Sequence, residues 1–112
     1  MGQTQEYLWS DPKDKQVKLQ RHRAKFEKLK MNEKEDIATY FIRVEEVVNA
    51  IGGLGEGIHE SLVVQKVLRS LLLKYDVKVS SIEETRDLNK LTMDELHGSF
   101  IAYEMRTCIE SD

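Results

Sequence analysis

The sequence predicts an all-α protein, a compact orthogonal bundle of about five helices. In successive segments, apolar residues recur at three- and four-residue steps, which places them on one side of a helix. The 112 residues include only one proline, and no segment shows a convincing strand pattern. Short amphipathic helices joined by tight loops bury their apolar faces by packing across one another.

The first predicted helix is basic and covers about residues 13–30, after an N-terminal extension over residues 1–12. Pro12 suits the opening turn of a helix, where its missing N–H costs nothing. The helix region carries eight Lys and Arg against two acidic residues, a net charge of +6, so the rest of the chain carries −9 of the total of −3. This asymmetry allows a nucleic-acid contact or a head-to-tail attraction between copies. Its apolar-leaning stripe consists of Leu19, His22, Phe26 and Leu29.

The second predicted helix, about residues 34–51, has one clean apolar face and ends at a glycine pair, Gly52-Gly53, which can close a helix. A charged turn precedes it. If this turn folds back, the carboxylate of Glu35 can reach the guanidinium of Arg43, two turns along the helix, and hold the turn in place. The apolar face consists of Ile37, Tyr40, Phe41, Val44, Val48 and Ile51.

The third predicted helix, about residues 60–71, buries the stripe Val64, Val67, Leu68 and Leu71 and leaves Leu62 and Val63 beside it. The fourth, about residues 74–84, carries Tyr75, Val79 and Ile82. Its stretch Val77–Ser80 could instead form a short strand.

The fifth predicted helix begins at a capping box, Thr92 to Glu95, in which each side chain accepts a hydrogen bond from the other residue's N–H. Its buried face consists of Met93, Leu96, Phe100 and Tyr103. The prediction is thus a single domain over residues 13–110, with a core bundle over residues 34–109.

No residues point to catalysis, a cofactor or a metal. The three histidines lie in separate segments, and the single Cys108 excludes an internal disulfide and a zinc knuckle. The glycine-rich stretch 52–57 follows a helix and lacks the Gly-Lys-Ser/Thr ending of a phosphate loop. Adjacent acidic pairs, such as Glu45-Glu46, diverge around a helix. We therefore expect no enzyme.

Nothing in the sequence indicates a membrane protein. No apolar run approaches the ~20 residues that a spanning helix needs. The start Met1-Gly2 would suit myristoylation, but Glu6 stands where that signal has Ser or Thr. One cysteine suits a reducing compartment, so we expect a cytoplasmic protein.

Two family resemblances rest on these residues. Glu35, Ile37, Tyr40 and Arg43 resemble the major homology region of retroviral capsid C-terminal domains. From about residue 6 to residue 106, the chain resembles the Gag polyprotein of Copia-like LTR retrotransposons. The matching phrases are Phe26-Glu27-Lys28-Leu29-Lys30-Met31, Tyr40-Phe41-Ile42-Arg43, Leu68-Arg69-Ser70-Leu71, Thr92-Met93-Asp94-Glu95-Leu96 and Ala102-Tyr103-Glu104-Met105-Arg106.

The chain departs from these families at two places. Leu72 and Leu73 stand where the Copia-like family usually has proline, so the third and fourth helices could run together. Met31 and Asn32 stand where the retroviral region has glutamine and glycine. The network of that region would therefore reduce here to the Glu35–Arg43 contact.

The resemblance implies a capsid-like structural domain that forms homodimer or lattice contacts in virus-like particles. In such domains the helix after the homology region dimerises, which is the third helix here. The alternatives are a domesticated Gag-derived adaptor that binds a host protein, and RNA contact through the basic helix. The expected outward interface residues are Leu62, Val63, Lys66 and Ser70, and the possible nucleic-acid contacts are Lys15, Lys18, Arg21, Arg23 and Lys25.

Overall fold

The computed structural model describes residues 12–111 and the side chains of residues 13–107. Within this range the chain forms five α-helices and one short 3₁₀ helix, and no strand, so the all-α prediction is confirmed. The Val77–Ser80 stretch lies inside a helix, so the strand alternative is wrong. The elements are α2 (Pro12–Glu27), α3 (Ile37–Gly53), α4 (Glu60–Arg69), η1 (Leu73–Tyr75), α5 (Asp76–Thr85) and α6 (Met93–Ser111).

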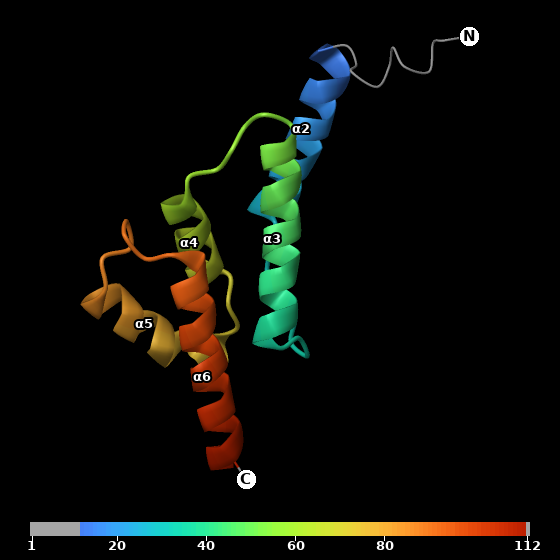
Figure 1. The fold of residues 1–112 in the computed structure, drawn as a ribbon. Helices are drawn as coiled ribbons and strands as arrows, with labels where there is room; N and C mark the ends of the chain where they lie inside the picture. Colours follow the sequence, from blue (N-terminus) through green and yellow to red (C-terminus); the bar gives the residue numbers. More distant parts are fainter. Residues whose placement is uncertain (1–11, 112) are drawn as a thin grey trace.

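Helices α2 and α6 pack against α3, as Figure 1 shows. The basic helix α2 lies along one side of α3. On the other side, α6 runs antiparallel to α3: the α3 start contacts Glu104 near the α6 end, and Phe41 stacks on His97 one turn into α6. Helix α4 packs beside α6, and α5 lies at the far edge of this half of the bundle.

The core is formed by the apolar faces that the periodicity predicted. The largest fully buried side chains include Tyr40, Phe41, Tyr75 and Phe100. Their rings meet in edge-on contacts, Tyr40 with Phe41 at 5.8 Å and Tyr75 with Phe100 at 5.9 Å between centroids. Such geometry suits the ring quadrupoles. The aromatic contacts therefore join α3 within itself and η1 to α6.

Two helix boundaries, the end of α2 and the start of α3, differ from the prediction by three residues. Helix α2 stops at Glu27, and the following chain turns inward so that the Met31 N–H donates to the Ser70 carbonyl at 2.9 Å. Helix α3 begins at Ile37 because the Asp36 carboxylate accepts from the Thr39 N–H at 2.9 Å, an N-cap that satisfies an unpaired donor.

The third and fourth helices are separate, so a continuous helix through Leu72-Leu73 does not form. Helix α4 ends at Arg69, and Leu72 adopts an extended backbone before η1. The predicted capping box is confirmed at the start of α6, where Thr92 Oγ1 accepts from the Glu95 N–H and Glu95 Oε1 accepts from the Thr92 N–H, both at 3.1 Å. In the part of the chain that the structure describes, no helix combines the length and apolarity that crossing a bilayer requires.

Candidate functional site

The charged turn before α3 is closed by an ion pair between Glu35 and Arg43. The guanidinium donates twice to the carboxylate, from Nε to Oε2 at 2.6 Å and from Nη2 to Oε1 at 2.7 Å. The Glu35 side chain is only 5% exposed, and that of Arg43 is 35% exposed. A bidentate pair of this kind is strong because both partners are charged and their geometry matches. The contact that the sequence predicted is thus present.

The same two residues also hold the backbone around them. Arg43 Nη2 donates to the Lys30 carbonyl at 2.7 Å, and Glu35 Oε1 accepts from the Asn32 N–H at 2.9 Å. Tyr40 extends the network to α4, since its hydroxyl donates to the Val67 carbonyl at 3.3 Å. The network therefore joins three segments: the loop between α2 and α3, helix α3 itself, and α4.

The protonation states in this network follow from its contacts. The hydrogen bond from Arg43 lowers the pKa of Glu35, which keeps the carboxylate charged at neutral pH. Burial raises the pKa of Tyr40 to about 12, so its hydroxyl stays protonated and can donate. The network acts as a fixed clamp at neutral pH and offers no group poised for proton transfer.

A second clamp, which the sequence did not predict, is formed by Glu104 of α6. Its Oε2 accepts from the Ile37 N–H at 3.0 Å and from the Tyr75 hydroxyl at 2.9 Å. The carboxylate therefore caps the start of α3 and ties it to η1. Burial, together with this hydrogen bond, raises the pKa of Tyr75. The only sequence signal was an acidic residue on the mostly buried side of a predicted helix.

Two of the four predicted interface residues do not face outward. Val63 is 3% exposed and Ser70 is 7% exposed, so the prediction that they are outward is wrong. Helix α4 buries Val63 and Val64, and Val67 and Leu68 one turn later, because these four positions lie on one side of the helix, with Val63 four residues before Val67. Ser70 turns inward at the end of the helix, where its carbonyl accepts the Met31 N–H.

The other two predicted interface residues border a hollow between α2 and α4. Leu62 is 54% exposed, and Lys66 is half-buried with its ammonium group donating to the Glu27 carbonyl at the end of α2. The hollow has a volume of about 550 Å³. Its apolar lining residues are Phe26, Ile58 and Leu62, and its cationic ones are Arg23, Lys66 and Arg69.

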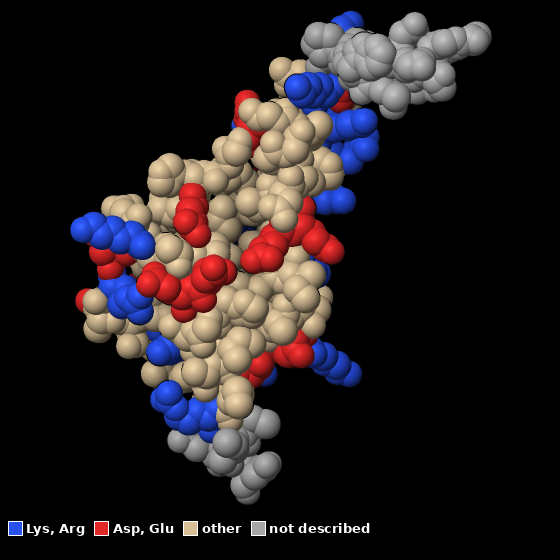
Figure 2. Space-filling view, in the orientation of Figure 1, with Lys and Arg blue, Asp and Glu red and all other residues tan. Residues whose placement is uncertain are grey.

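The predicted nucleic-acid residues lie along α2, where Figure 2 shows a concentration of Lys and Arg. All five side chains are exposed: Lys15, Lys18, Arg21, Arg23 and Lys25. Arg23 also forms an ion pair with Glu56 of the loop after α3, which holds that loop against α2. Arg23 therefore has a structural contact of its own.

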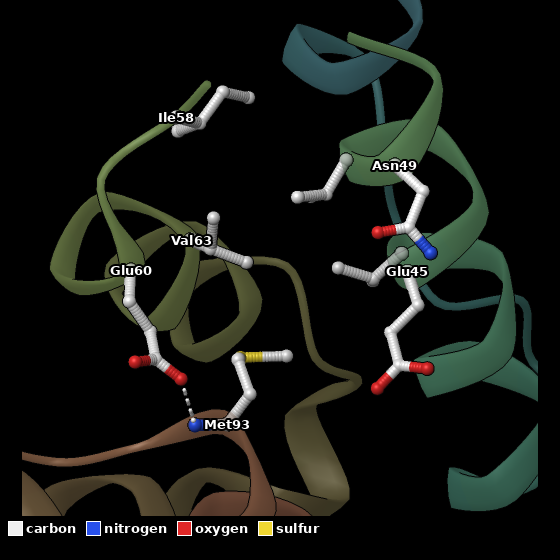
Figure 3. A pocket seen from close by; sticks show the side chains of 8 residues that line it. Glu45, Asn49, Ile58, Glu60, Val63 and Met93 are labelled. Atoms are coloured by element: carbon white, nitrogen blue, oxygen red, sulfur yellow. Dashed lines mark hydrogen bonds between the residues drawn. The ribbon is translucent and has the colours of Figure 1, made fainter. Parts of the chain in front are cut away.

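A second hollow, about 430 Å³ in volume, lies between α3 and α4, and Ile58 lines both hollows. Figure 3 shows Asn49 and Glu45 on the α3 wall, Ile58, Glu60 and Val63 on the α4 wall, and Met93 below them. Glu60 Oε2 accepts from the Met93 N–H at 2.9 Å, which fixes the start of α6 against α4. Among the side chains of residues 13–107, no group of three or more His, Cys, Asp or Glu could hold a metal ion.

Comparison with known proteins gives one match. A family model described as the gag-polypeptide of LTR copia-type matches residues 6–111, which is nearly the whole chain. Neither the curated proteins nor the solved structures contain a significant match.

Proposed function

Because this chain belongs to the family of gag polypeptides of copia-type LTR elements, a family with a structural role, we propose that it is a self-assembly domain. In this proposal the domain forms homodimer or lattice contacts in virus-like particles, has no catalytic activity and acts in the cytoplasm. Its fold supports a rigid building block, since two charged clamps fix the helices relative to one another.

The observation that carries the proposal is the exposed Leu62 beside the hollow between α2 and α4. The other apolar residues of α4 are buried, whereas Leu62 remains 54% exposed. Its side chain is therefore available for a contact. The neighbouring hollow offers Phe26 and Ile58 as an apolar lining. Leu62 of one copy can therefore occupy the hollow of a second copy.

A two-fold axis across α4 makes this contact reciprocal. In an isologous interface the same patch of each copy meets the other. Leu62 and the adjoining hollow of each copy therefore give two identical contacts. Such an interface would be small. A small interface is sufficient for a lattice, because many weak contacts add up through multivalency.

The test compares two exposed leucines. Leu62→Glu places a carboxylate in the proposed contact, whereas Leu73→Glu makes the same change at a leucine that is 85% exposed on η1. We expect Leu62→Glu to abolish dimerisation in sedimentation velocity at high salt, and Leu73→Glu to leave it unchanged. Equal dimerisation by the Leu62→Glu variant would remove α4 as the interface.

Nucleic-acid contact is a second candidate function, favoured by one arrangement of cations. Lys28 and Lys30, just after α2, lie around a hollow of about 410 Å³ together with Lys66 and Arg69 of α4. Cations from two elements can follow a phosphate backbone more closely than a single helix does. Lys28→Glu with Lys30→Glu should weaken binding of single-stranded RNA and reduce its salt dependence. Unchanged affinity would exclude this cleft.

A further inference from the structure

The hollow between α3 and α4 is a groove with an apolar floor and acidic walls, here called the acidic groove. Its lining residues are Val44, Glu45, Val48, Asn49, Ile58, Glu60, Val63 and Met93. Val44 and Val63 are buried and form the floor, while Glu45 and Glu60 are exposed on facing walls. Figure 2 shows acidic side chains gathered in the middle of this face, with Lys and Arg at its margins. The groove suits an occupant that is both apolar and cationic.

Helix α2 has such a surface on its outer side. Leu19 and Phe26 face the domain and are partly buried, and the stripe half a turn away is exposed. That outer stripe consists of Val17, Arg21, Ala24 and Lys28, and Val17 is 52% exposed. Residues 13–30 together carry a net charge of +6. One exposed valine among cations is therefore complementary to an apolar floor between carboxylates.

We infer that the acidic groove binds the outer face of α2 from a second copy of this chain. A copy's own α2 cannot reach the groove with this face, because α2 packs along the other side of α3 through the opposite face. In the contact, Val17 lies over the groove floor. Arg21 and Lys18 then approach the carboxylates of Glu45 and Glu60, which supplies attraction at low ionic strength.

The geometry makes this contact heterologous. The donor surface and the acceptor groove are different parts of the molecule, so each copy can bind one neighbour through each. Repetition gives a ring or an open chain rather than a closed dimer. This inference deepens the proposed self-assembly, and it is independent of the reciprocal contact through α4 and Leu62.

The test uses Leu62→Glu as the background, so that the α4 contact does not contribute. In this background we compare Arg21→Glu, which alters the donor, with Glu45→Lys, which alters the groove. Glu84→Lys, at an exposed position of α5 away from the groove, is the control for the charge change of Glu45→Lys. Sedimentation velocity over a range of protein concentrations at low and high salt measures the association.

We expect the background chain to form salt-sensitive species larger than two copies. Arg21→Glu and Glu45→Lys should each weaken association by roughly tenfold or more, and Glu84→Lys should not. An equimolar mixture of the two variants should restore association. The intact α2 of the Glu45→Lys chain can occupy the intact groove of the Arg21→Glu chain, and the two reversed charges attract each other in the remaining contact.

Three results would overturn the inference. One is a mixture that associates no better than either variant alone. Another is a control, Glu84→Lys, that weakens association as much as Glu45→Lys, which would indicate a general charge effect. The third is a loss of association on removal of residues 1–11 together with no effect of Arg21→Glu, which would make the N-terminal segment the occupant. None of these results bears on dimerisation through Leu62.

Discussion

The Arg43 guanidinium donates two hydrogen bonds, of 2.6 and 2.7 Å, to the carboxylate of Glu35, which lies eight positions earlier in the chain. Its Nη2 also donates to the Lys30 carbonyl. One side chain thus fixes both the turn before α3 and the loop that follows α2. The consequence is that the basic helix and the core of the bundle are held in one orientation, which a repeated assembly contact requires.

Arg43→Ala should lower the free energy of unfolding by about 2 kcal/mol, the range expected when a hydrogen-bonded charge loses its partner. The loss is substantial because the Glu35 side chain is only 5% exposed and would remain unpaired. A domain of this size would then melt roughly 8–15 °C lower. Thermal unfolding followed by circular dichroism measures the change.

Two controls accompany this variant, one for the geometry of the donors and one for the loss of an arginine as such. Arg43→Lys keeps the charge but not the fork of donors, so we expect an intermediate loss. Arg106→Ala removes an exposed arginine from α6 and should leave the melting temperature unchanged. If Arg43→Ala melts at the same temperature as Arg106→Ala, the clamp does not stabilise the domain.

The stability contributed by Glu35 should depend on pH. Its pKa lies below the usual value of 4.5 because of the Arg43 hydrogen bond. A folded-state pKa below the unfolded one gives stability that is fully present above the unfolded pKa and is lost as pH falls through the folded pKa. Urea unfolding of the unmodified chain and of Glu35→Gln should therefore differ by a constant amount near neutral pH, and the difference should shrink in acid. A difference that grows on acidification would contradict this assignment.

Glu104 and Tyr75 should be energetically coupled. Glu104→Ala removes the acceptor of both the Tyr75 hydroxyl and the Ile37 N–H, whereas Tyr75→Phe removes one hydrogen bond and leaves the carboxylate bound to Ile37. We expect losses of about 2–3 and about 1 kcal/mol. In a double-mutant cycle, the double variant should lose less than the sum of the two. Strict additivity would mean that this hydrogen bond contributes nothing.

Leu62 and Val63 are neighbours in sequence with opposite environments, so the same substitution should have opposite effects. Leu62→Glu should keep the helical circular dichroism signal and the melting temperature, because Leu62 is 54% exposed. Val63→Glu should unfold the domain, because a carboxylate at a 3% exposed position costs several kcal/mol. A folded Val63→Glu variant would show that the α4 packing differs from this structure.

Local patterns were sufficient to predict much of this fold. The steps between Ile37, Tyr40 and Val44 identified the buried face of α3, and Thr92 with Glu95 identified the start of α6. These signals are local, since each depends on residues within two turns of one another. The Glu35–Arg43 contact spans eight residues and was also within reach of such reasoning.

The missed features depend on contacts between distant segments. Glu104 meets partners 29 and 67 positions away, which no periodicity contains. The outward prediction for Val63 failed because the buried face of α4 is wider than the predicted stripe and includes the position four residues before Val67. The start of α3 at Ile37, three residues later than predicted, was missed because Asp36 looks like one more charge in a charged turn, although it is the N-cap.

Light scattering after gel filtration, over a wide range of protein concentration, tests the central claim of self-association most directly. We expect a mass that rises from one chain toward two in the unmodified protein at high salt, where the ionic contact between copies is screened. At low salt the mass should rise beyond two chains. A mass of one chain at every concentration and both salt conditions would contradict self-assembly by this domain.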